Sequence, residues 1–132
     1  MPAARGGAPK RTVVIGEDDE PIAILLRDAI SDEPGYQAVI EPDGRKVVDT
    51  VRKWHADLLI LDIMMPGLSG FDIYDRLRAD RSTAKMPILI ISAAVGHFSE
   101  DLLRRGITEV IAKPFDLNDF LERVHKLCPS GA

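Results

Sequence analysis

Short apolar runs without polar alternation recur along this chain, and stretches with helical periodicity separate them. Such runs are typical of strands that are covered on both faces, as in a parallel sheet. Four runs have this character: Val13–Ile15, Leu58–Leu61, Pro87–Ile91 and Val110–Ala112. Tyr36–Glu41 mixes apolar and polar residues, as an edge strand does. Five strands alternating with helices predict an α/β fold, a five-stranded open parallel sheet wound on both faces by five helices.

The segments between the strands carry the apolar stripes of five helices. Pro21 suits the first turn of the first helix, Pro34-Gly35 follows its end, and Asp43 is placed to cap the second. The stripes consist of Ile22, Leu25, Leu26, Ala29 and Ile30; Val47, Val48, Val51 and Trp54; Phe71, Tyr74 and Leu77; Leu102 and Leu103; and Leu117, Phe120, Leu121, Val124 and Leu127.

Length and charge exclude several classes of protein. The 132 residues are enough for one domain, which we predict over residues 12–127, after a flexible lead (1–11) and before a short tail (128–132). The lead holds three basic residues and no acid, so the remainder has 14 basic and 21 acidic residues. This balance argues against direct nucleic-acid binding.

Cysteine and hydropathy patterns point to the cytoplasm. A single cysteine, Cys128, excludes an internal disulfide framework and fits a reducing compartment. The three histidines are scattered, so no zinc-site spacing occurs. The apolar runs are too short to span a membrane, and the N-terminus lacks a secretory apolar core. We therefore expect a cytoplasmic protein with no membrane partner.

Chemically distinctive residues stand where the predicted strands end. Glu17-Asp18-Asp19-Glu20 follows the first strand, Asp62 ends the third, Ser92 follows the fourth, and Lys113-Pro114 follows the fifth. Each alone is an ordinary loop residue, but parallel strands bring their carboxyl ends to one edge, where ligands bind. Converging carboxylates repel, and a hard cation such as Mg²⁺ or Mn²⁺ relieves the repulsion. With a hydroxyl and a lysine, such a site suits phosphoryl transfer.

These residues carry a family resemblance. Over residues 12–127 the chain resembles bacterial response-regulator receiver domains, including single-domain receivers like the chemotaxis regulator. The matching motifs are the acidic cluster, Leu61-Asp62-Ile63-Met64-Met65-Pro66-Gly67, Ser92-Ala93 and Lys113-Pro114-Phe115, and the separation of 44 residues between Asp18 and Asp62 is also typical. The resemblance implies a flavodoxin-like sheet with strand order 2-1-3-4-5 and a cis Lys113–Pro114 bond.

The resemblance also implies a role for each site residue. Asp62 matches the phosphoacceptor, Ser92 the hydroxyl that turns toward the phosphoryl group, and Lys113 the lysine that pairs with it. The implied metal ligands are Asp18 directly, Glu17 through water, Asp62, and the backbone carbonyl of Met64. Asp19 would replace a member of the acidic pair if the alignment slipped by one, although the stripe of the first helix argues against this.

The resemblance implies partners and a mode of action. A sensor histidine kinase or histidine phosphotransfer protein would supply the phosphoryl group in a Mg²⁺-dependent reaction, with Mn²⁺ as the alternative ion. The domain would then switch its contacts with a downstream protein, and a homodimer formed on phosphorylation is part of this expectation. Such a domain is no classical enzyme, because it assists only its own phosphorylation and dephosphorylation.

Two features depart from the family's pattern. An aromatic residue usually stands three positions before the lysine, where this chain has Val110, so a switch that turns an aromatic ring inward is not expected in its usual form. The segment between Ser92 and Lys113 is also slightly short, which predicts a small or irregular fourth helix.

Three alternatives to an active single receiver fit the sequence less well. A nucleotide-binding fold is disfavoured because four acids occupy the turn where a glycine-rich loop should meet pyrophosphate. A degenerate receiver that binds proteins without phosphorylation stays open, although all five key positions are chemically competent. A receiver cut from a longer regulator or hybrid kinase also stays open.

Overall fold

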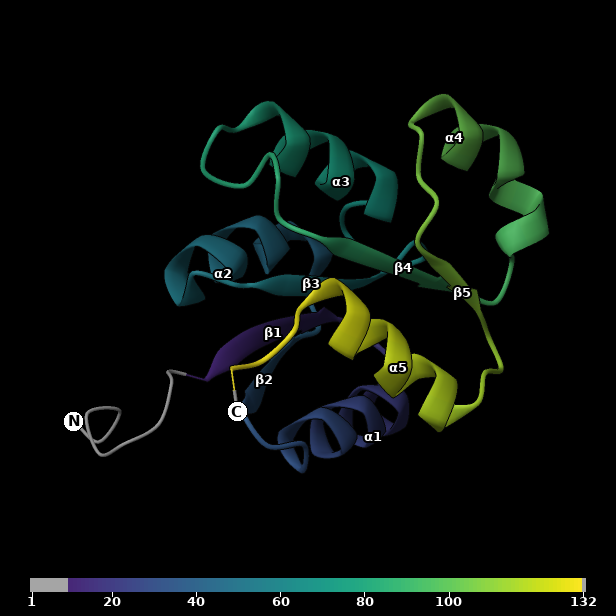
Figure 1. Ribbon diagram of the computed structural model, residues 1–132. Helices are drawn as coiled ribbons and strands as arrows, with labels where there is room; N and C mark the ends of the chain where they lie inside the picture. The colour runs from purple at the N-terminus through teal and green to yellow at the C-terminus, as the bar shows by residue number, and fades with distance from the viewer. Residues whose placement is uncertain (1–9, 132) are drawn as a thin grey trace.

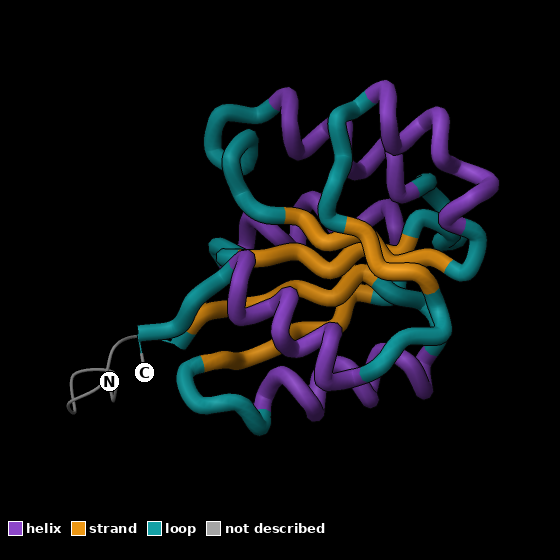
Figure 2. The backbone as a smooth tube through the Cα atoms, turned by 45° about the vertical axis from the view of Figure 1, so that its right-hand side comes forward, coloured by secondary structure: helices purple, strands orange, loops and turns teal. Residues whose placement is uncertain are grey.

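A computed structural model describes residues 10–131 as a parallel sheet of five strands. The strands are β1 (Arg11–Gly16), β2 (Tyr36–Glu41), β3 (Leu58–Asp62), β4 (Ile88–Ser92) and β5 (Val110–Ala112). All four pairings are parallel, and the order is β2-β1-β3-β4-β5. The strands lie side by side in one sheet, with helices around it (Figure 2). The predicted fold class and strand order are confirmed.

Five α-helices connect the strands and cover both faces of the sheet. They are α1 (Glu20–Ser31), α2 (Val47–Trp54), α3 (Gly70–Ala79), α4 (Ser99–Arg104) and α5 (Leu117–Leu127). Two short 3₁₀ turns, η2 (Gly44–Lys46) and η3 (Val95–Phe98), precede α2 and α4. Helices α1 and α5 lie on one face, and α2, α3 and α4 lie on the other (Figure 1).

The strands divide the core into two apolar layers, because successive side chains point to opposite faces. In β1, Val13 and Ile15 pack with Leu26, Ile30 and Phe120 under α1 and α5, whereas Val14 packs under α2 and α3. All five residues of β3 are buried, and so are all five of β4. The absence of polar alternation in these runs therefore reflects a sheet that is covered twice.

The connection from β4 to β5 is short, as predicted. Helix α4 has six residues and follows η3. An edge contact between the rings of Phe98 and Phe71, with centroids 5.6 Å apart, attaches η3 to α3. Arg105 follows α4 and donates to both carboxylate oxygens of Asp75, at 2.9 and 3.0 Å. Val110 stands half-buried at the start of β5.

The predicted boundaries shift slightly at both ends of the domain. Strand β1 begins at Arg11, inside the segment expected to form the lead, while residues 1–9 lie outside the described part. Arg11 Nε donates to the carbonyl of Pro129 at 3.0 Å, and the buried Tyr36 hydroxyl donates to the carbonyl of Cys128. The first residues of the predicted tail are therefore attached to the sheet. Among residues 10–131, no helix combines the length and apolar character needed to cross a membrane.

Phe120 should be a main anchor of α5, since its side chain is fully buried against the sheet. We expect Phe120→Ala to lower the free energy of unfolding by about 3–5 kcal/mol, because it removes a large apolar side chain and leaves a cavity. Leu103→Ala is the control, since Leu103 is 81% exposed and such surface changes stay within about 0.5 kcal/mol. Urea unfolding measures both, and similar losses in the two variants would contradict this packing.

Candidate functional site

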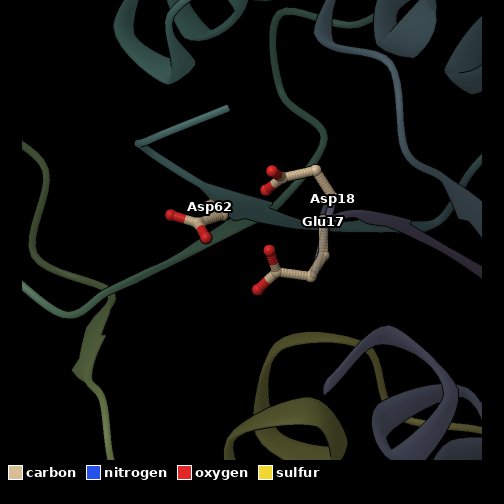
Figure 3. A group of neighbouring side chains, drawn as sticks. All are labelled: Glu17, Asp18 and Asp62. Atoms are coloured by element: carbon tan, nitrogen blue, oxygen red, sulfur yellow. The ribbon is translucent and has the colours of Figure 1, made fainter. Parts of the chain in front are cut away.

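Three carboxylates converge at the carboxyl ends of β1 and β3. Glu17 and Asp18 follow β1 directly, and Asp62 is the last residue of β3. Parallel pairing of these strands, with Gly16 beside Leu61, places the three side chains together. One oxygen from each carboxylate lies within 4.8 Å of the others (Figure 3). The strand register thus builds an acidic cluster from residues 44 and 45 positions apart.

The three carboxylates differ in their exposure to solvent. Glu17 is 1% exposed and Asp62 5%, whereas Asp18 is exposed. Burial raises the pKa of Glu17 to about 7, a hydrogen bond from Lys113 acts in the opposite direction, and the neighbouring Asp62 adds to the rise. The cluster therefore holds two buried acids and one exposed acid, and burial makes Glu17 costly to keep charged.

Lys113 lies between the two buried acids. Its Nζ atom donates to Glu17 Oε1 at 2.6 Å and to Asp62 Oδ2 at 2.8 Å. Burial alone would lower the pKa of Lys113, but the hydrogen bonds to the two carboxylates outweigh it and raise this pKa. The backbone N–H of Lys113 donates to the carbonyl of Ser92, and the Lys113–Pro114 bond is cis. One ammonium group thus partly offsets the charge of the cluster.

Asp62 is held by groups on both of its oxygens. While Oδ2 accepts from Lys113, Oδ1 accepts from the backbone N–H of Met64 at 2.9 Å. The Met64 side chain itself is 59% exposed. Ser92 is fully buried at the end of β4, and its Oγ accepts from the Ala94 N–H at 3.0 Å. The carboxylate of Asp62 is therefore oriented by one side chain and one loop amide.

Asp19 belongs to helix α1 rather than to the acidic cluster. Its side chain is the N-cap of α1 and accepts from the Ile22 N–H at 3.3 Å, while its own N–H donates to Glu17 Oε2. The structure thus groups Glu17 and Asp18 with Asp62, and Asp19 begins the helix that follows.

The donor set of the cluster fits a hard divalent cation. Glu17, Asp18 and Asp62 offer only carboxylate oxygens, which suit Mg²⁺ and Mn²⁺ better than softer metals. With Lys113 protonated and all three acids ionised, the four side chains carry a formal charge of −2. A divalent cation would balance this charge.

The family of this chain follows from comparison with known proteins. The family model of the response regulator receiver domain matches residues 13–125. The chain belongs to the response regulator receiver family. It is 30% identical to the polar-differentiation response regulator DivK of Brucella ovis over 115 residues, which cover 86% of this chain and 93% of that protein.

The chain is also similar to a sensor histidine kinase and to a solved response regulator. The chain is 32% identical over 116 residues to the sensor histidine kinase TmoS of Ectopseudomonas mendocina; the match covers 87% of this chain and 12% of that protein. A solved structure of a putative response regulator from Chloroflexus aurantiacus is similar, with a TM-score of 0.80, 27% identity, and coverage of 90% of this chain and 98% of that one.

A solved receiver structure with a metal shares the fold. It is the receiver domain of the sensor histidine kinase PA1611 from Pseudomonas aeruginosa, with a magnesium ion coordinated in the active-site cleft. Its TM-score is 0.78 at 22% identity, and the match covers 92% of this chain and 99% of that one.

Two features of the site lie beyond the sequence prediction. Lys113 contacts Glu17 as well as Asp62, although its expected partner was the phosphoryl group. The N–H of Met64 also orients Asp62, whereas the family resemblance implies a role only for the carbonyl of Met64. A backbone donor has no signature in the sequence, because every residue except proline carries one.

Removing Lys113 should destabilise the metal-free domain, because Glu17 and Asp62 would lose their shared cation. We expect Lys113→Gln to lower the free energy of unfolding by about 3 kcal/mol. This is the lower end of the range for breaking a buried ion pair, because the Lys113 side chain keeps 15% exposure. Urea unfolding in EDTA measures the loss. The matched control is Lys85→Gln, which changes an exposed lysine in the turn before β4. An equal effect of the two changes would show that the buried contact contributes nothing.

Proposed function

We propose that this receiver domain accepts a phosphoryl group on Asp62 from a histidine kinase or histidine phosphotransfer protein, in a reaction that needs Mg²⁺. The observation that supports this most is the placement of the Asp62 carboxylate between Lys113 and the Met64 N–H, beside Glu17 and Asp18. A carboxylate, a cation and two further acids therefore share one edge of the sheet, as such a reaction would require. Membership of the receiver family supports the same assignment.

In the proposed transfer, an oxygen of Asp62 forms a bond to phosphorus while the bond from phosphorus to the donor breaks. The donor's leaving atom, a histidine nitrogen in the kinase, keeps the electron pair of that bond. Lys113 is close enough to Asp62 to donate to a phosphoryl oxygen as its negative charge develops. Ser92 Oγ accepts from Ala94, which leaves its hydroxyl hydrogen for such an oxygen.

The metal would be held by Glu17, Asp18 and Asp62, with the Met64 carbonyl as a further ligand. A bound Mg²⁺ would supply positive charge against the phosphoryl oxygens. The acids would differ in how they meet the metal, because Asp18 is exposed to solvent whereas Glu17 is buried and hydrogen-bonded to Lys113.

Partner and location are part of the same proposal. Phosphorylation would change contacts with a downstream protein, and a homodimer is one form of that change. A cytoplasmic location is supported by the single cysteine, and the acidic balance supports action without direct nucleic-acid or membrane contact.

Asp62 should be the single site of phosphorylation. With acetyl phosphate and Mg²⁺, intact-mass spectrometry should show one added phosphoryl group in the parent protein and none in Asp62→Asn, and EDTA should suppress the addition. Asp49→Asn is the control, because Asp49 is an exposed acid on α2. Equal labelling of Asp62→Asn would refute the assignment. A parent protein that takes up no phosphoryl group would favour a phosphorylation-independent binding module.

Mg²⁺ should stabilise the unphosphorylated fold, because a cation that binds only the native state raises the free energy of unfolding by RT ln(1 + [L]/Kd). At 100 times Kd the gain is about 2.7 kcal/mol by this relation. The melting temperature should therefore rise with Mg²⁺. Asp18→Ala should flatten the response, while Glu122→Ala, an exposed acid on α5, should keep it. A parent protein whose melting temperature ignores Mg²⁺ would argue against the metal site.

A further inference from the structure

The loop between β3 and α3, residues 63–69, packs closely against two buried glycines. Gly44 belongs to η2, in the connection between β2 and α2, and Gly70 is the first residue of α3. The loop carries Met64, whose N–H donates to Asp62 Oδ1. Its position therefore bears directly on how the Asp62 carboxylate is oriented.

Gly44 leaves no room for a side chain on the side that faces the loop. A Cβ atom built there would lie 2.7 Å from the carbonyl oxygen of Leu68 and 3.0 Å from that of Pro66. Both are backbone atoms, so no rotamer change relieves the overlap. The backbone of η2 thus lies directly against the backbone of the loop.

Gly70 makes a matching contact from the start of α3. A Cβ atom there would lie 2.6 Å from the Cα of Ile63 and 2.9 Å from the carbonyl oxygen of Asp62. The Gly70 N–H also donates to the Ile63 carbonyl at 2.9 Å. The two glycines therefore contact both ends of the loop.

The turn that carries Gly44 is itself fixed by local hydrogen bonds. Asp43 Oδ1 accepts from the Arg45 N–H at 2.9 Å, and the Asp43 carbonyl accepts from the Lys46 N–H at 2.9 Å. The Arg45 side chain extends over Gly67, whose Cβ position would be 3.1 Å from Arg45 Cγ. η2 thus offers the loop a fixed surface.

We propose that Gly44 and Gly70 are positioning residues for the phosphoacceptor site, and we call the pair the glycine clamp. By allowing backbone to meet backbone, the clamp holds the loop where the Met64 N–H orients Asp62. The same placement would aim the Met64 carbonyl at the metal, so this inference rests on the proposed Mg²⁺-dependent function. The clamp acts through the loop, because its close contacts are with backbone atoms of residues 62–68.

Gly44→Ala tests the clamp by displacing the loop with one methyl group. Gly96→Ala is the matched control, because a Cβ at Gly96 meets nothing within 4 Å. Two quantities are measured: amide hydrogen exchange at Met64 in EDTA, and the Mg²⁺ dissociation constant from titration followed by NMR. Faster exchange in the metal-free protein reports loss of the bond to Asp62, which a merely structural glycine would not single out. The dissociation constant should rise on the order of 10-fold or more, as for other groups that orient metal ligands.

Two further variants keep the test decisive should Gly44→Ala not fold. Gly70→Ala displaces the loop from its other end. Asp43→Ala adds no atom, and it loosens η2 by removing the cap on Arg45. Each should speed Met64 exchange relative to amides in β3 and weaken Mg²⁺ binding.

The outcomes separate the clamp from the function on which it rests. Unchanged Met64 exchange and Mg²⁺ affinity in the folded variants, with a parent protein that binds Mg²⁺ and is phosphorylated, would overturn the clamp alone. Weaker Mg²⁺ binding by Gly96→Ala to the same degree would also overturn it. A parent protein that neither binds Mg²⁺ nor accepts a phosphoryl group would overturn the proposed function and the clamp with it.

Discussion

The contact of one ammonium group with two buried carboxylates joins the strand ends at the candidate site. Lys113 follows β5, whereas Asp62 ends β3, and β4 lies between them. The two strands are therefore about 10 Å apart, two inter-strand spacings. The lysine side chain, its hydrogen bond and the Asp62 side chain together bridge this distance. A cation too short to reach them would leave Glu17 and Asp62 buried with like charge and without this cationic partner.

The sequence predicted the sheet well because burial on both faces leaves a strong pattern. Val13–Ile15 and Leu58–Leu61 lack polar alternation, and the structure buries them completely. The carboxyl ends of parallel strands share one edge of the sheet. The sequence therefore predicts that Glu17, Asp18 and Asp62 lie together, as the structure shows. The short helix before β5 was also predictable, since too few residues separate Ser92 from Lys113 for a long one.

The contacts made by backbone atoms could not be predicted from the sequence. Met64 N–H reaches Asp62, and Gly44 meets the carbonyls of Pro66 and Leu68, yet neither contact requires a distinctive side chain. The acidic run after β1 was ambiguous for a related reason. A carboxylate suits a helix cap as well as a metal site. The stripe of the first helix favoured Asp18 over Asp19 for the acidic cluster. The geometry makes Asp19 the cap of α1 and groups Asp18 with Glu17 and Asp62.

The site is thus positioned by two kinds of constraint that differ in their sensitivity to change. Asp62 and Ser92 are the last residues of paired strands in the middle of the sheet, so moving either requires disrupting β3 or β4. Met64 lies on a loop whose place depends on close contacts with η2 and α3. Substitutions deep in the apolar layers therefore affect Asp62 and Ser92 chiefly by unfolding the domain. Changes in the connection between β2 and α2, by contrast, can alter the orientation of Asp62 while the sheet stays intact.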